Sequence, residues 1–197
     1  MLDLPVPPPG PPGPFGTMAW LRATVCRFAE GETHARRRAM IDRRLAALDP
    51  AELRAAARAV ANADGGIPLE YVPVAVLAAA TGVQGDVLNE VRRVAAAYQP
   101  GTGAPGADEA LKRLIARWPE GDEEELAQHV ALLVQACEAT AALIRGDDPP
   151  VPTTKRLDRD GNVIVVSLEG RPFGEGRRAC PGREHALALA QGVKDVR

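Results

Sequence analysis

The sequence is poor in aromatic residues, cysteine and histidine, and each shortage excludes a class of protein. Aromatic residues fill 4% of the 197 positions, so few side chains are available on which nucleic-acid bases could stack. The three cysteines have no C-x-x-C spacing and cannot all pair, which argues against a disulfide framework and for a reducing, cytoplasmic compartment. Cysteines and histidines also lack the ligand spacing of a zinc site.

Long apolar runs and a strong net charge are missing as well. No apolar run approaches the roughly 20 residues that a membrane span needs, and no basic segment followed by an apolar run marks a secretory signal. A net charge of −2 argues against a protein that coats nucleic acid. The hydrophobic content of 46% is ordinary for a folded chain. We therefore expect one domain with a tail, and neither a membrane nor a nucleic acid as partner.

The order of segments predicts a mainly α-helical domain with one small β-hairpin. Residues 1–16 are rich in proline and glycine and predict a disordered arm, which leaves 17–197 as the folded domain. The longest helix is expected over 122–145, where apolar residues keep helical spacing after an acidic start. A hairpin is predicted around 159–161, because an Asp-Gly turn stands between two β-prone runs, and a last helix is predicted from 183.

Two helix starts are predicted from capping residues. Thr33 is placed to cap a helix that runs through the arginine-rich segment from His34 onward. Asp49 followed by Pro50 is typical of a cap and a first-turn proline.

The segment R-P-F-G-E-G-R-R-A-C-P-G-R-E-H carries the chemical signal of the sequence. It presents Cys180 from a glycine-rich loop at the start of a helix, where backbone N–H groups and the helix dipole stabilise negative charge. We therefore expect Cys180 to be a thiolate. Glycines allow the loop to approach a large flat group, and Arg178 is suited to an anionic group on the same ligand.

This segment resembles the haem-thiolate signature of the cytochrome P-450 family. The resemblance implies haem b as cofactor and Cys180 as the ligand of its iron. It also implies that the neighbouring motif positions contact the cofactor: Phe173, Gly174, Gly176, Arg178, Ala179 and Gly182. A structural cysteine before a helix is the alternative, but it leaves the coincident motif residues unexplained.

Two further segments are similar to the family's propionate-binding segments. His34 and Arg38 fit its H-x-x-x-R pattern and lie four residues apart, on one face of a helix. Arg156 takes the position of an arginine that reaches a propionate, at the start of the family's β region. The resemblance implies that these three side chains hold haem propionates. For the basic run as a whole, a solvated helix face is the alternative.

The segment V-Q-A-C-E-A-T-A-A-L-I is similar to the family's long helix over the distal haem face. Glu138 and Thr140 take the positions of its acid and its threonine, which implies proton relay toward bound oxygen. The motif is degenerate, since Ala136 stands where the family has glycine. An exposed glutamate and an ordinary helical threonine are the alternative.

The chain also departs from the family in what it lacks. The family's E-x-x-R helix is absent between Thr140 and Cys180; the two literal E-x-x-R matches, Glu90–Arg93 and Glu175–Arg178, stand elsewhere and are not replacements. The lid helices, the meander before the cysteine loop and the C-terminal sheet are missing or much reduced. We expect an open distal face, easier access of peroxide and weaker selection of substrate. A second copy of the chain covering that face is compatible with the sequence.

The sequence thus favours a shortened haem-binding oxidoreductase of cytochrome P-450 type. It would act on a small organic substrate, using O2 and electrons from a redox partner protein, or using peroxide. The preference for arginine over lysine points to a bacterial origin. Two alternatives remain open: a non-catalytic P-450-like auxiliary protein, and an internally deleted relative with impaired haem binding.

Overall fold

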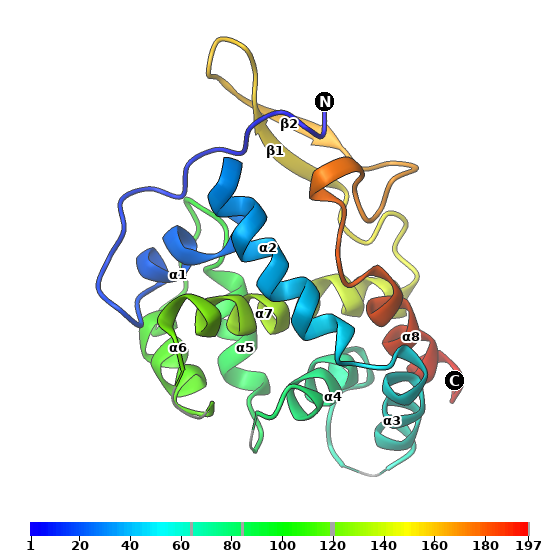
Figure 1. Ribbon diagram of the computed structural model, residues 1–197. Coiled ribbons are helices and arrows are strands. Elements are labelled where there is room, and N and C mark those ends of the chain that lie inside the picture. Colours follow the sequence, from blue (N-terminus) through cyan, green and yellow to red (C-terminus); the bar gives the residue numbers. More distant parts are fainter. Residues whose placement is uncertain (64, 84, 119–120, 197) are drawn as a thin grey trace.

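The computed structural model describes residues 1–63, 65–83, 85–118 and 121–196, so that Arg197, the last residue of the predicted domain, lies outside it. The chain is mainly helical and carries one two-stranded sheet, as the sequence predicts (Figure 1). Its α-helices are α1 (Met18–Thr24), α2 (Gly31–Ala46), α3 (Pro50–Asn62), α4 (Val72–Ala80), α5 (Leu88–Ala96), α6 (Ala107–Ile115), α7 (Glu123–Arg145) and α8 (Arg183–Lys194). Short 3-10 helices are η1 (Cys26–Phe28), η2 (Leu69–Tyr71) and η3 (Gly176–Arg178).

Of the two helix starts predicted from capping residues, one is confirmed and the other is wrong. Asp49 caps α3 by accepting a hydrogen bond from the Ala51 N–H at 2.7 Å, with Pro50 in the first turn. Thr33 does not cap α2, because that helix already begins at Gly31, two residues earlier. Its start after Glu30 leaves the Glu30 carboxylate free for contacts described below.

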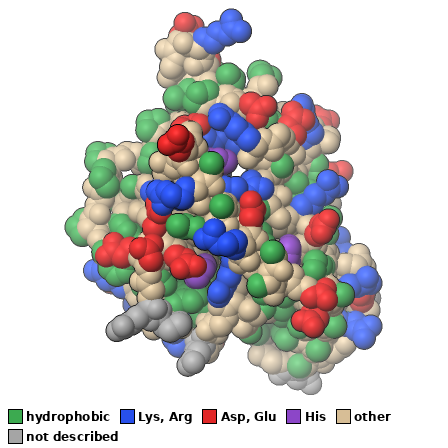
Figure 2. All heavy atoms as spheres, viewed as in Figure 1, with side chains coloured by type: hydrophobic (Ala, Val, Ile, Leu, Met, Phe, Trp, Pro, Cys, Tyr) green, Lys and Arg blue, Asp and Glu red, His purple; other side chains and the backbone are tan. Residues whose placement is uncertain are grey.

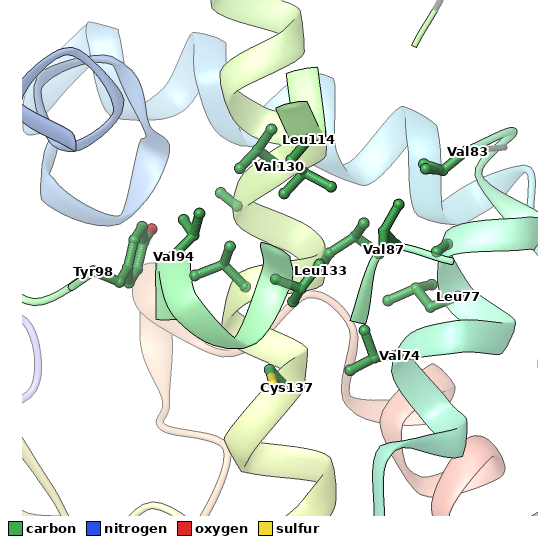
Figure 3. Packing of buried hydrophobic residues seen from close by; sticks show 14 of the residues in the cluster. Val74, Leu77, Val83, Val87, Val94, Tyr98, Leu114, Val130, Leu133 and Cys137 are labelled. Carbon is green, nitrogen blue, oxygen red and sulfur yellow. The ribbon is translucent and has the colours of Figure 1, made fainter. Parts of the chain in front are cut away.

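Helix α7 is the centre of the domain. Asp122 caps it through the N–H groups of Glu124 and Glu125, and buried residues recur along its length. Apolar side chains from α4, α5 and α6 converge on it, with Leu133 and Cys137 on its inward face (Figure 3). By length and composition α7 could cross a membrane, but 61% of its most apolar window is buried inside the domain, as in a core helix. Helix α7 is therefore the element around which the core packs.

Helices α3 and α8 cross at close range because of one glycine. A Cβ atom at Gly192 would lie 2.3 Å from the Arg54 carbonyl oxygen and 2.9 Å from the Ala57 Cβ. The absence of a side chain at this position lets the two backbones approach. Together with contacts between α7 and α8, this crossing fixes the helix whose first turn follows Cys180.

Strands β1 (Thr153–Leu157) and β2 (Val163–Ser167) form an antiparallel hairpin in which Arg156 is opposite Ile164. Gly161 in its turn has a φ of 83°, which suits glycine in the predicted Asp-Gly turn.

The N-terminal arm lies against this hairpin, although the sequence predicts it to be disordered. The side chains of Leu2 and Val6 are buried, and Leu2 packs with Val166 and Leu168. The Leu157 N–H donates to the Pro5 carbonyl at 2.8 Å, which places the arm along the free edge of β1. Composition predicted the prolines' extended backbone but not the apolar side chains that hold the arm on the hairpin.

Candidate functional site

The cysteine loop has a fixed backbone conformation. The Cys180 N–H donates to the Phe173 carbonyl at 2.8 Å, which closes the loop at its base. Gly174 and Gly176 have φ values of 67° and 64°, a region that favours glycine, so both are required by the turn itself. Cys180 is exposed at the loop's end, two residues before the cap of α8.

The thiol of Cys180 does not meet the expectation of a thiolate in the free chain. Desolvation by the surrounding protein raises the pKa of Cys180. A backbone hydrogen bond from Gly182 and the charge of Arg38 act in the opposite direction without outweighing it. The helix N-terminus therefore lowers the pKa less than desolvation raises it, and the free thiol stays protonated at neutral pH.

Arg178 anchors the loop to the start of α2. Its guanidinium lies 2.6 Å from a Glu30 carboxylate oxygen and donates to the Ala29 carbonyl at 2.8 Å. The side chain is only 5% exposed, and its Nε has no hydrogen-bond partner. The buried Nε–H of Arg178 thus remains available to donate a hydrogen bond to an acceptor.

Glu30 connects three segments at this point, and sequence reasoning missed it. Besides Arg178 it accepts a hydrogen bond from the Val6 N–H of the arm at 2.7 Å. Burial acts to raise the pKa of Glu30, but the bonds from Val6 and Arg178 outweigh it, so that the pKa is lowered and the carboxylate stays charged. No motif marks this residue, because its partners come from distant parts of the sequence.

His34 and Arg38 lie beside the cysteine loop, as their resemblance to the H-x-x-x-R pattern implies. Arg38 donates to the Ala179 carbonyl at 2.9 Å and pairs with Asp42 at 2.8 Å. His34 is buried, and burial together with the charges of Arg178 and Arg38 lowers its pKa. The imidazole is thus neutral at pH 7 in a cationic neighbourhood.

Arg156 brings a second strongly buried guanidinium to the same neighbourhood. It is 4% exposed and donates to the Leu2 carbonyl at 3.0 Å and to the Thr154 hydroxyl at 2.7 Å. Burial, followed by the charges of Arg27 and Arg178, lowers its pKa to about 10. Arg27, which sequence reasoning also missed, donates to the same Thr154 hydroxyl at 3.0 Å.

We call the guanidinium groups of Arg27, Arg38, Arg156 and Arg178, together with the neutral His34 imidazole among them, the cationic cluster. Their mutual electrostatic influence shows that the fold gathers them from η1, α2, β1 and the cysteine loop. Buried like charges repel one another unless anions compensate them, and within the described residues Glu30 pairs with Arg178 and Asp42 pairs with Arg38.

The remaining loop residues have roles within the chain. The Phe173 ring lies under the Arg183 guanidinium, at 5.5 Å from its centroid. The Ala179 carbonyl accepts a hydrogen bond from the Arg38 guanidinium. Gly182 has a negative φ that other residues also adopt, and the Leu45 side chain lies close to it.

Glu138 and Thr140 are not brought together by the structure, contrary to their predicted shared role. Glu138 is exposed, while Thr140 is 1% exposed and its hydroxyl donates to the Ala136 carbonyl at 2.8 Å. Residues two apart on a helix point to different faces. A proton relay from Glu138 through Thr140 is therefore not formed by this arrangement.

The basic run of α2 is paired with acids over part of its length. Arg36 and Arg37 both pair with Glu124 at the start of α7. Basic and acidic side chains are interspersed on the face that α2 crosses (Figure 2). This face therefore carries both signs of charge.

The donor set at the cysteine loop fits a haem. It offers a reachable thiol at Cys180 and, close by, buried cations including an Arg178 Nε without an acceptor, which suit propionate oxygens. Among the described residues, no group of three or more Asp, Glu, His or Cys side chains could hold a metal ion by itself. A single cysteine would instead serve as an axial ligand to a metal held by a macrocycle.

The fold is that of a cytochrome P-450-like helical domain. The structure is similar to that of P450BioI, solved in complex with an acyl carrier protein ligated to hexadec-9Z-enoic acid, with a TM-score of 0.70 and 12% identity. The superposition covers 98% of this chain and 80% of that chain. No family model matches the sequence, and no curated protein matches it.

Proposed function

We propose that the chain is a haem-binding protein of cytochrome P-450 type in which Cys180 ligates the iron. The single observation that carries this proposal is the juxtaposition of an exposed cysteine, at the start of α8, with the cationic cluster around a cysteine loop of the expected sequence. The similarity of fold over nearly the whole chain supports it.

In this proposal the residues of the chain bind and orient the cofactor. Cys180 holds the iron, and His34, Arg38, Arg156 and Arg178 hold the propionates. Haem with a thiolate ligand supplies the chemistry of O–O cleavage, with O2 or peroxide as oxidant. Because ligation needs the sulfur deprotonated, binding releases the proton that the Cys180 thiol carries in the free chain.

The substrate and the partners follow from the same proposal. We place a small organic molecule as substrate and, for the O2 reaction, a redox partner protein as electron donor. The acyl carrier protein seen with P450BioI shows that a P-450 fold accepts a protein-bound substrate. For this chain, the cytoplasm remains the proposed compartment.

Titration of the full chain with hemin tests the proposal. We expect stoichiometric binding with a thiolate-type Soret spectrum, and loss of that spectrum in Cys180→Ser. Cys26→Ser is the matched control, because Cys26 is buried and donates to the His34 carbonyl rather than facing solvent. Spectra that Cys180→Ser leaves unchanged would contradict the proposed ligand. Absence of hemin binding in the folded chain would favour the non-catalytic auxiliary protein.

A further inference from the structure

A pocket lies between the arm, η1 and the hairpin, and no residue of the cysteine loop lines it. Its volume is about 170 Å³. Residues from five segments line it: Val6, Pro7, Arg27, Phe28, Gln99, Pro100, Lys155 and Val163. Of the cationic cluster, only Arg27 reaches it. The pocket is therefore a separate site that shares one wall with the proposed cofactor site.

Arg27 brings an uncompensated charge to this pocket. The side chain is half-buried, and its guanidinium donates one hydrogen bond, to the Thr154 hydroxyl at 3.0 Å. Within the ranges that the structure describes, no carboxylate oxygen forms an ion pair with it. Burial lowers its pKa, which is the mark of a cation that the chain desolvates without neutralising.

Two further polar residues are Lys155, which lines the pocket, and Tyr98, which is next in the chain to a lining residue. Lys155 lines the pocket from the exposed face of β1, and its ammonium has no ion pair in the described part of the chain. Tyr98 precedes the lining residue Gln99, and its ring packs on that of Phe28, with 5.4 Å between centroids. The Tyr98 hydroxyl is buried and has no hydrogen-bond partner. The Tyr98 side chain lies next to Val94 of α5, at the edge of the buried side chains drawn in Figure 3.

Apart from Gln99, the rest of the lining is apolar, and it includes an exposed side chain. Phe28, Pro100 and Val6 form a nonpolar wall, and Val163 is 56% exposed on β2. The site thus combines two cations with a short apolar wall, which is the pattern of pockets for amphipathic ligands.

We propose that this pocket binds a small aliphatic carboxylate. Its carboxylate would lie between Arg27 and Lys155, and its hydrocarbon body would cover Phe28, Pro100 and Val163. A carboxylate supplies the charge that Arg27 lacks and an acceptor within the neighbourhood of the Tyr98 hydroxyl. The volume, about that of five or six water molecules, limits the buried part to a chain of a few carbons.

The probe for this site is butanoate, with butan-1-ol as the comparison that keeps the body and removes the charge. The full chain, without added haem, is followed by NMR at the Val6 and Val163 methyl groups. We expect saturable shifts with butanoate and a dissociation constant on the order of 1 mM, as befits a ligand of few atoms. Butan-1-ol is expected to bind about tenfold more weakly, because it leaves both cations uncompensated.

Substitutions at exposed positions separate the site from general effects on folding. Lys155→Gln should weaken butanoate binding about threefold or more, while Arg159→Gln, also on the hairpin and exposed, should leave it unchanged. Arg27→Gln should weaken binding further. Cys180→Ser should leave it intact, so the outcome is independent of the haem proposal. Equal binding of butanol and butanoate, or shifts that Lys155→Gln does not change, would overturn the inference.

Discussion

At the scale of single residues, the site is defined by charges that the protein desolvates. Arg178 is nearly enclosed and leaves its Nε without an acceptor, and Arg156 is buried beside it. The chain compensates them with Glu30 and with the backbone carbonyls of Leu2 in the arm and of Ala29 after η1. Uncharged acceptors solvate a guanidinium less well than a carboxylate does, so an anionic ligand should bind here in preference to a neutral one.

The raised pKa of Cys180 predicts how hemin affinity depends on pH. Below the pKa of the thiol the fraction of thiolate rises with pH, so the apparent affinity for hemin should increase by up to about tenfold per pH unit between pH 6 and 8. His34 adds little in this range, because its lowered pKa keeps it neutral. Hemin titrations at several pH values measure this slope. An affinity that does not change with pH would mean that Cys180 is not the ligand.

The sequence predicts some residues of this site and misses others, and the reason is physical. Cys180, Arg178, His34 and Arg38 stand in contiguous motifs with a local spacing, and the structure places them around one loop. Arg27 and Glu30 carry no such signal, because each acts through a partner more than a hundred residues away in the chain. Glu138 and Thr140 also stand in one motif, but α7 leaves Glu138 exposed and buries Thr140.

At the scale of elements, the arm takes part in holding the cysteine loop. Its Val6 N–H binds Glu30, its Leu2 carbonyl binds Arg156, and its Asp3 carbonyl accepts from Arg177 of the loop at 3.2 Å. The sequence resembles the cytochrome P-450 family but has no E-x-x-R helix between Thr140 and Cys180, the segment that in that family braces the cysteine loop. The arm and Glu30 thus supply contacts to a loop that lacks that brace.

Detaching the arm should loosen the loop and expose Cys180 further. Leu2→Ser removes a buried side chain from the contact with Val166 and Leu168, at a cost of about 2 kcal/mol to the docking of the arm. The rate at which a thiol reagent labels Cys180 in the native chain should rise severalfold, with Cys26 and Cys137 protected by burial. Pro8→Ser is the matched control, since Pro8 is exposed. Equal labelling rates in both variants would show that the arm does not hold the loop.

Helices were easier to predict than the position of the arm. The spacing of apolar residues predicted α7 to within a residue at its start, and Asp49 with Pro50 marked α3. The start of α2 was placed too late, because Thr33 is a good cap in isolation while the chain enters the helix already at Gly31. The arm's docking depends on Leu2 and Val6 meeting a distant hairpin, which periodicity does not reveal.

At the scale of the whole molecule, one core joins α1 and α3 to α8, while α2 packs through a separate small cluster of Cys26, Ile41 and Leu45. A single cluster of buried apolar side chains includes Leu21 of α1, Leu133 of α7 and Val193 of α8. A core to which both the first and the last α-helix contribute is the mark of a unit that folds together, and it argues against the hypothesis of a poorly folding, internally deleted relative.

This core predicts one cooperative thermal unfolding transition. Trp20 and Trp118 both belong to the cluster, one in α1 and the other after α6. Their fluorescence should therefore change at the same temperature as the helical circular dichroism. Transitions that do not coincide, or a broad change without a midpoint, would instead support the deleted relative. The hairpin and arm form a separate small cluster, which should open at lower free energy than the helices.

The most direct test of the proposed haem-thiolate centre is the spectrum of the reduced, hemin-loaded chain under carbon monoxide. Cysteine thiolate as the axial ligand gives a red-shifted Soret band, because its sulfur donates electron density to the iron. We predict this band for the full chain and for Cys26→Ser, and its disappearance in Cys180→Ser. An unshifted band in the full chain, or a red-shifted band that persists in Cys180→Ser, would contradict the assignment.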